Sequence, residues 1–361
     1  TIGDRDYWSR GYGTDAVRLS LLLGAAPGTD IVATEERMES ARAFANKLWN
    51  ASRFIALNME RSKVDPWLTH ELDCCRPEPH PDSLSPSLED RWIFSRLNRC
   101  AETVNRAIDT YRYHEVAQTL WHFIWHEFCD WYIELKKLRF EENSGLNPHW
   151  RNLLTVYEMM LRLLHPVMPF ISEEIWQAVY DGRAPLKSIA LAEYPQGQES
   201  QIDLAAETDM AILQDLIVSV RNLRAELKIE QKQRIAVEIY ADAAIRKLME
   251  ENRGAVEKLA SVDTLRFAPE PLAKLPGSRS PARFDVHVVY EQKVDLAVEC
   301  ERLKKDLEKI EKEMSGARQQ LGNESFVAKA PAEVVEGRRK RLTELEVLQR
   351  KAKNKLLELK C

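Results

Sequence analysis

The sequence predicts a mainly α protein built from a helical bundle, a small α+β module and a C-terminal antiparallel coiled-coil hairpin. Three observations support this prediction. Apolar residues recur every three or four positions over most of the first 228 residues, polar and apolar residues alternate after position 234, and leucines follow a 4-3 spacing over the last 70 residues. With 361 residues, 44% of them hydrophobic and 30% charged, the chain has the composition of a folded protein of two or three domains.

The helical bundle is predicted at residues 34–228, after a short connecting segment at 1–33. Thr34 is suited to cap a long first helix, because two glutamates follow it in the first turn, where carboxylates favour the helix dipole. Proline breaks and helical periodicity predict the further helices at 88–111, 114–140, 150–165 and 204–228. A shorter helix is expected to begin at Ser172, with Ser172 as its cap.

The α+β module is predicted at residues 229–290 and the hairpin at 291–361. Strand-like alternation and helical periodicity in the module place strands at 234–241, 264–268 and 284–290, and a helix at 245–259. In the hairpin, Gly322 is expected to end the first helix and Pro331 to open the second. Each helix would be about 40 Å long.

Charge and cysteine content limit the functional classes. The net charge is −5, but residues 291–361 hold 17 Lys and Arg against 14 Asp and Glu, so a nucleic acid would meet local basic patches rather than a basic body. The six cysteines are scattered without a C-x-x-C pair, which favours a reducing, cytoplasmic setting. No apolar run approaches the about 20 residues that span a bilayer, so no membrane partner is expected. The chain opens on threonine, which indicates a piece of a longer polypeptide.

The first long helix has two different faces. Phe44, Leu48 and Ile55 fall on one apolar stripe that a bundle core would bury. Cations, amides and an aromatic ring lie on another part of the helix surface: Asn46, Lys47, Asn50, Arg53 and Phe54. Together these groups can bind phosphate, base edges and unstacked bases, so the face predicts contact with unpaired nucleotides. A merely solvated charged face is the alternative interpretation.

Several segments resemble one family, the valyl-tRNA synthetases of class I. Residues 42–54 (RAFANKLWNASRF) closely resemble the anticodon-binding helix of that family, and residues 323–331 (NESFVAKAP) resemble the tip of its C-terminal tRNA-binding arm. Residues 12–18 (YGTDAVR), 125–132 (WHEFCDWY) and 164–176 (LHPVMPFISEEIW) resemble segments of its helical bundle. The bundle would then be the anticodon-binding domain and the hairpin the tRNA arm.

The resemblance implies a tRNA-recognition role with two sets of contact residues. The anticodon set is Arg37, Asn46, Lys47, Asn50, Arg53 and Phe54. The elbow set, for the outer corner of the tRNA, is Lys304, Lys305, Phe326, Lys329, Arg338, Arg339 and Arg341. The implied partners are tRNA-Val and the catalytic domain of the same polypeptide, and the chain is expected to be a monomer.

Motifs for catalysis are missing from the sequence. It contains neither the His-x-Gly-His motif nor the Lys-Met-Ser-Lys-Ser loop with which class I synthetases bind ATP, and no Gly-rich phosphate loop. We therefore expect no catalytic residue, no cofactor and no adenylate formation by this polypeptide alone, although the parent enzyme would use ATP and Mg²⁺. ATP–pyrophosphate exchange above background would contradict this expectation.

Alternative interpretations concern metals and function. His122, His126 and Cys129 have a spacing that could bind zinc, as do the histidines and cysteines between His70 and His80, but histidines packed or hydrogen-bonded in a helix are the expected case and no metal site is predicted. The functional alternatives are an isoleucyl- or leucyl-tRNA synthetase, a coiled-coil protein that pairs with another chain, and a free-standing RNA-binding protein. The hairpin and the absence of a cysteine-rich terminus speak against the first.

Overall fold

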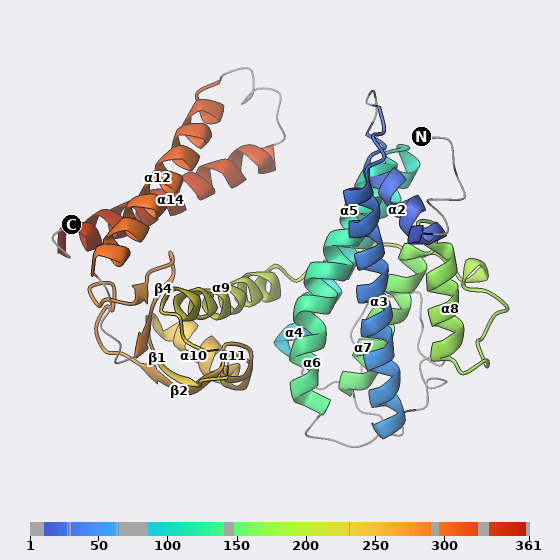
Figure 1. Cartoon of the computed structure of the whole chain (residues 1–361), viewed down its shortest axis with the longest axis horizontal. Coiled ribbons are helices and arrows are strands. Elements are labelled where there is room, and N and C mark those ends of the chain that lie inside the picture. The colour runs from blue at the N-terminus through green and yellow to red at the C-terminus, as the bar shows by residue number, and fades with distance from the viewer. Residues whose placement is uncertain are drawn as a thin grey trace. The chain divides into compact units, whose positions relative to one another are not determined.

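The computed structural model describes residues 11–26, 28, 30–62, 64, 86–140, 148–230, 232–289, 296–323 and 332–358. The chain forms two compact units, 1–210 and 211–361 (Figure 1). The first is a helical bundle, and the second combines a four-stranded sheet with a long helical hairpin. The predicted mainly α fold is confirmed. Among the described residues, no helix is both long and apolar enough to span a membrane.

Helix α3 (Glu35–Ser62) is the long first helix of the bundle. Thr34 caps it as predicted, because the Thr34 hydroxyl accepts a hydrogen bond from the Arg37 backbone N–H at 3.3 Å. Its apolar stripe is buried, and the buried side chains include Phe44, Leu48 and Ile55. The helix therefore offers its opposite face to solvent.

Helices α2 (Thr14–Leu23) and α8 (Pro169–Val179) are joined by polar contacts. The Asp15 carboxylate accepts hydrogen bonds from the backbone N–H groups of Phe170 and Ile171, at 3.4 and 2.6 Å. Arg18 donates to the carbonyl oxygens of Pro166 and Val167. Asp15 thus caps α8 from a distant part of the chain.

The prediction that Ser172 caps this helix was wrong. The helix begins at Pro169, three residues earlier, because proline at the first helical position needs no hydrogen-bond partner for its nitrogen. Ser172 is buried inside the helix, and its hydroxyl donates to the Met168 carbonyl oxygen at 2.7 Å.

The remaining bundle helices follow the predicted order. Ser87 caps α4 (Leu88–Asp109) by accepting from the Asp90 backbone N–H. The predicted helix over 114–140 is continuous but changes character, from α5 (Tyr113–His122) through the π-helix η2 (Phe123–Tyr132) to α6 (Ile133–Phe140). A wider π turn is not visible in hydrophobic periodicity. Helix α7 (Pro148–Leu164) completes this group.

A buried ion pair links α4 to α6 inside the bundle. The Lys136 ammonium lies 2.6 Å from the Asp90 carboxylate, and both side chains are almost inaccessible to solvent. The Tyr132 hydroxyl donates to the same carboxylate at 2.6 Å, and the His149 imidazole lies 3.6 Å away. Burial alone would raise the pKa of Asp90, but Lys136 and these hydrogen bonds hold that pKa below its usual value.

The sheet of the second unit has the strand order β2-β1-β4-β3. Strands β1 (Ile235–Ala241), β2 (Val262–Phe267) and β4 (Phe284–Val289) lie close to the predicted positions. The short β3 (Ser278–Arg279) was not predicted. β1 is parallel to β2 and antiparallel to β4, which pairs antiparallel with β3. The connection from β1 to β2 is helical, as a parallel pair requires.

Two helices rather than one make that connection. The predicted helix over 245–259 is divided at Asn252 into α10 (Ala243–Glu251) and α11 (Arg253–Leu259). Asp242 caps α10, its carboxylate accepting from the Ile245 backbone N–H at 2.9 Å. The preceding helix α9 (Leu204–Glu226) runs from the first unit into the second.

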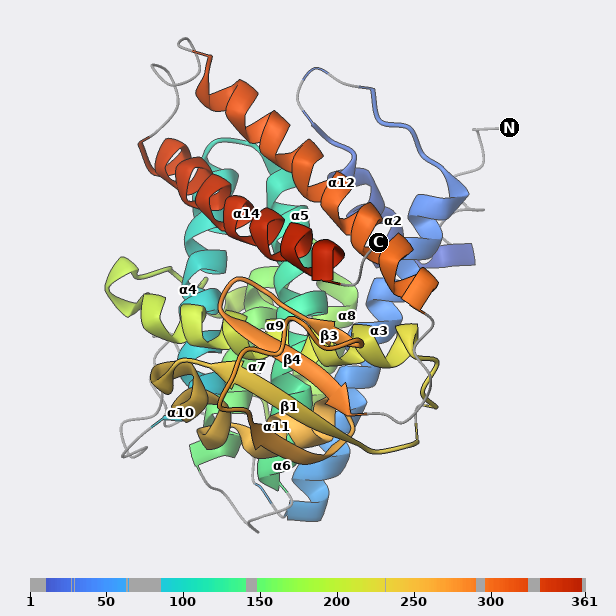
Figure 2. The same cartoon turned by 90° about the vertical axis from the view of Figure 1, so that its left-hand side faces the viewer.

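The hairpin consists of α12 (Leu296–Leu321) and α14 (Ala332–Glu358), which pack side by side (Figure 2). The predicted seam is buried at Leu303, Met314 and Leu345. Ion pairs between the two helices fix their register, among them Arg341 with Glu313 at 3.1 Å. Of the described cysteines, Cys100 and Cys129 are buried thiols, whereas Cys300 on α12 is disulfide-bonded, which the scattered spacing did not predict.

Candidate nucleic-acid interface

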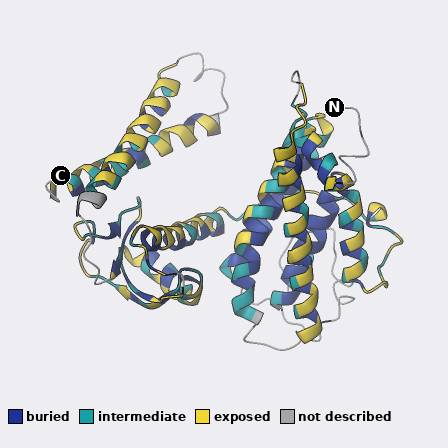
Figure 3. Cartoon of the chain, in the orientation of Figure 1, coloured by how far each residue is buried: buried dark blue, intermediate teal, exposed yellow. Residues whose placement is uncertain are grey.

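The exposed side of α3 presents the two asparagines of the predicted anticodon set and one of its two arginines, Arg53. Asn46, Asn50 and Arg53 are exposed, and the burial colouring shows the solvent side of α3 against its buried side (Figure 3). They recur at helical spacing, so they share one stripe. Among the described residues, none of these three side chains is recorded in a hydrogen bond or ion pair, so their polar groups are available to a ligand.

The most exposed aromatic ring on this stripe is Trp49, which the sequence reasoning missed. Its exposed fraction is 47%, and it lies between Asn46 and Arg53 along the helix. A tryptophan next to a buried leucine looks like a core residue in a linear sequence. The signal that could have found it was its helical position, one turn from both Asn46 and Arg53 and opposite the buried stripe.

Lys47 and Phe54 lie on the flank of the stripe rather than at its centre. The Lys47 ammonium is 2.5 Å from an Asp130 carboxylate oxygen and 4.1 Å from the centre of the Trp125 ring, both on the π-helix. The Phe54 ring is half-buried, with the Lys137 ammonium 4.8 Å from its centre. These two residues therefore border the interface and contact the neighbouring helix.

Arg37 stands apart from the other predicted anticodon residues. It is exposed in the first turn of α3, and its guanidinium donates to the Val32 carbonyl oxygen at 3.0 Å. This contact holds the segment before the helix. The structure thus brings Asn46, Asn50 and Arg53 together and leaves Arg37 several turns away along α3.

Two histidines at the junction of α5 and the π-helix are paired with acids. The rings of His122, at the end of α5, and His126, in the π-helix, lie 5.4 Å apart, since about one helical turn separates them. His122 is 3.3 Å from the Glu127 carboxylate and His126 is 3.4 Å from that of Asp130. Burial raises the pKa of the Cys129 thiol to about 12, so it does not present a thiolate ligand.

No metal centre emerges from the described part of the chain, where no group of three or more His, Cys, Asp and Glu side chains could hold an ion. The alternative site between His70 and His80 lies outside the described residues.

Among the described residues, some of the predicted elbow cations on the hairpin form ion pairs with nearby acids, and others do not. Lys305 pairs with Glu301 at 2.7 Å, which raises the pKa of Lys305. Arg341 is also paired, with Glu313 on the facing helix. Lys304, Arg338 and Arg339 are exposed and, within the described ranges, have no recorded ion pair. Phe326 and Lys329, at the tip, lie outside the described residues.

Two family models match this chain. The anticodon-binding domain of tRNA ligases matches residues 90–239, and the valyl-tRNA synthetase tRNA-binding arm matches residues 295–360. The chain therefore contains an anticodon-binding domain and a tRNA-binding arm of the aminoacyl-tRNA synthetase class.

Its relatives define the family more closely. The valine–tRNA ligase of Solibacter usitatus is 46% identical over 335 residues, which is 93% of this chain and 36% of that protein. The enzyme of the same name from Bacillus subtilis is 35% identical over 356 residues, 97% of this chain and 38% of that protein. The chain belongs to the valine–tRNA ligase family, and it spans a little over a third of the length of these relatives.

Proposed function

We propose that this chain binds tRNA-Val and serves as the recognition part of a valine–tRNA ligase. The exposed face of α3 contacts the anticodon loop, and the unpaired cations of the hairpin contact the tRNA elbow. The observation that supports this most is the α3 stripe itself, where Trp49 and three polar side chains without partners among the described residues face solvent above a buried core. A ring for stacking beside free amides and a cation suits unstacked bases.

The surrounding enzyme is part of the proposal. We infer that the full polypeptide joins valine to tRNA-Val with ATP and Mg²⁺, and that it works as a monomer in the cytoplasm, where proteins are synthesised. A coiled-coil protein that pairs with another chain is less well supported, because α12 and α14 already pack on each other within one chain. Sedimentation of the purified chain measures the monomer directly.

A footprint of tRNA-Val on the purified chain tests the proposal. We expect protection from nuclease at both the anticodon loop and the elbow, and tighter filter binding of tRNA-Val than of tRNA-Ile or tRNA-Leu. Equal affinity for all three tRNAs, or no protection at the anticodon loop, would reject the anticodon assignment of the α3 stripe.

Replacing Trp49 and Phe54 of α3 separately is expected to show which ring contributes to general tRNA affinity and which to specificity for tRNA-Val. Trp49→Ala should cost about 1–3 kcal/mol of tRNA binding, because it removes an exposed stacking platform without opening the core. Phe54→Ala should reduce the affinity for tRNA-Val more than for other tRNAs. Glu60→Ala, on the same exposed side of α3, is the control and should not weaken binding. An equal loss for all tRNAs in Phe54→Ala would mean that this ring supports the backbone contact and reads no base.

A further inference from the structure

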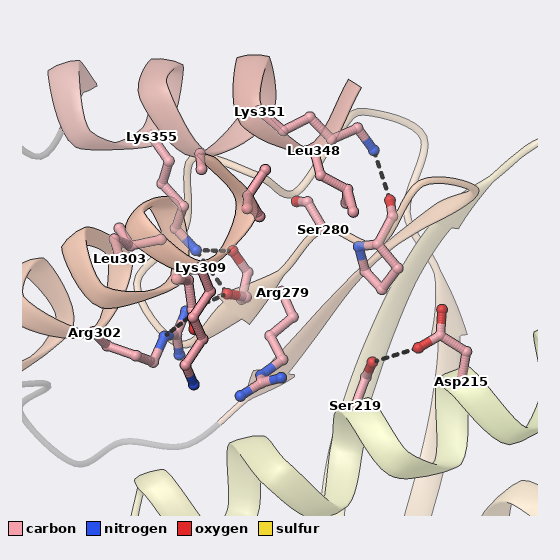
Figure 4. A pocket seen from close by; sticks show the side chains of 15 residues that line it. Asp215, Ser219, Arg279, Ser280, Arg302, Leu303, Lys309, Leu348, Lys351 and Lys355 are labelled. Atoms are coloured by element: carbon pink, nitrogen blue, oxygen red, sulfur yellow. Dashed lines mark hydrogen bonds and ion pairs between the residues drawn. The ribbon is translucent and has the colours of Figure 1, made fainter. Parts of the chain in front are cut away.

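A polar cavity lies at the root of the hairpin, within the second unit. It has a volume of about 310 Å³. Figure 4 shows side chains of α12 and α14 converging on the turn around β3, with Asp215 and Ser219 of α9 opposite. We call it the arm-root pocket. Five basic and two acidic residues line it: Arg279, Arg302, Lys309, Lys351, Lys355, Asp215 and Asp306.

Three of the five cations fasten the hairpin to the sheet. The buried Lys355 ammonium donates to the carbonyl and the hydroxyl of Ser278, at 2.6 and 2.8 Å. Lys351 donates to the Pro281 carbonyl oxygen at 3.0 Å and lies 3.4 Å from Asp285. Arg302 pairs with Glu226 at the end of α9. These contacts give the three cations a structural role, so no ligand is needed to explain them.

The other two cations, Lys309 and Arg279, have donor groups without a hydrogen-bond partner among the described residues. Lys309 is exposed at the rim and, among the described residues, has no recorded ion pair or hydrogen bond. Arg279 uses one terminal nitrogen to pair with Glu226, while its buried Nε has no hydrogen-bond partner. The Ser280 hydroxyl is likewise buried without a partner. Unsatisfied buried donors are costly, so a pocket that keeps them favours a ligand that accepts hydrogen bonds.

The acids of the pocket do not cancel this preference. Asp306 is 3.8 Å from the Arg302 guanidinium, so its charge is directed to a cation that is already engaged. Asp215 accepts from the Ser219 hydroxyl at 3.5 Å. Figure 4 shows both Asp215 and Ser219 on the α9 side, whereas Lys309 and Arg279 extend beside the β3 turn. The charge of Arg279 is compensated in part by Glu226 and Asp215, whereas Lys309 has no recorded ion pair among the described residues.

We propose that the arm-root pocket binds an oxyanion of the phosphate class, held by Lys309 and Arg279. Charge-assisted hydrogen bonds from an ammonium and from a guanidinium are the usual means of holding phosphate. The anion would bind where α12 passes the sheet, and so would add a link between the hairpin and the module. This site is separate from the exposed faces to which we assign tRNA contacts, and phosphate binding can be tested without RNA.

Titration of the full chain with inorganic phosphate, at constant ionic strength set by chloride, tests the site. We expect a saturable rise in the melting temperature, because a ligand that binds only the folded state stabilises it. Lys309→Ala should weaken the phosphate affinity about tenfold, the loss of one charge-assisted contact, without affecting folding, since Lys309 has no recorded partner in the described structure.

Lys312→Ala is the matched control, because Lys312 is exposed on the same helix and does not line the pocket. An equal loss in Lys312→Ala, or no saturable effect of phosphate on the wild-type chain, would overturn the proposal.

The source of the phosphate group is resolved by adding tRNA at fixed ionic strength. If the group is a phosphodiester of bound RNA, inorganic phosphate should compete with tRNA and Lys309→Ala should weaken tRNA binding. If it is free phosphate, tRNA affinity should be the same in the wild type and in Lys309→Ala, while the phosphate titration still separates them. Failure of the proposed tRNA function would leave the phosphate titration unchanged, so the two proposals can fail independently.

Discussion

Lys136→Met is expected to lower the free energy of unfolding of the helical bundle by about 3–5 kcal/mol. The change removes the cation that lies 2.6 Å from Asp90, and neither side chain is accessible to water. The Asp90 carboxylate would remain buried with the Tyr132 and Ser87 hydroxyls and His149 beside it, but without its cation. An uncompensated buried charge is among the most costly defects that one substitution can cause.

Urea unfolding followed by the tryptophan fluorescence of the bundle measures this loss. Lys137→Met is the control, because Lys137 is the next residue along the chain and its partner Glu134 is similarly exposed to solvent. Such an exposed pair contributes no more than about 1 kcal/mol. The double variant Asp90→Asn with Lys136→Met should recover much of the loss, since no charge is then left unpaired. A loss as small as that of the control would show that the buried pair does not stabilise the bundle.

The same pair predicts a pH dependence. The pKa of Asp90 is lower in the folded chain than in the unfolded chain, because Lys136 and the hydrogen bonds outweigh burial. A lowered carboxylate pKa contributes stability that is present above the unfolded pKa of about 3.9 and is lost as the pH falls through the folded value. The contribution of Asp90 to the stability of the wild-type chain should therefore be constant near neutral pH and shrink below about pH 4, as urea unfolding at a series of pH values would show.

Helical periodicity predicted most of the bundle because the apolar stripe of each helix has to be buried. The stripe of α3 and the seam of the hairpin lie where the spacing of their apolar residues placed them. Periodicity could not predict the capping of α8 by Asp15, because these residues are more than 150 positions apart. Nor could it predict β3, whose two residues pair with β4 inside a loop rich in proline.

The sequence predicted which kinds of side chain make up the candidate site, but not which of them are free of other contacts in the fold. The sequence could assign Lys47 and Phe54 to the polar side of α3, but their surroundings are made by the π-helix and α6, about 80 positions later. Which cations of the hairpin are free also depends on the register between α12 and α14. Arg341 meets Glu313 across the seam, whereas its neighbours Arg338 and Arg339 do not meet an acid in the described structure.

The difference between the paired Arg341 and its neighbours Arg338 and Arg339, unpaired within the described ranges, predicts different effects on tRNA binding. Replacing Arg338 and Arg339 together by alanine is expected to weaken tRNA binding about tenfold to hundredfold at low salt, because each can donate charge-assisted hydrogen bonds to phosphate. The slope of log affinity against log salt concentration should become shallower by about 1.4–1.8 for two lost phosphate contacts. Filter binding over a range of potassium chloride concentrations gives both quantities.

Arg341→Ala is the matched control in the same run of cations. Its guanidinium is already 3.1 Å from Glu313 and 3.5 Å from Glu344, so an added phosphate would have to displace those carboxylates. Its removal should change the salt slope little, although it breaks a contact between the two helices. If Arg341→Ala flattened the slope as much as the loss of Arg338 and Arg339, the ion pairs of the free chain would not decide which cations reach the RNA. If neither variant changed the slope, these arginines would lie outside the interface and the elbow assignment would be wrong.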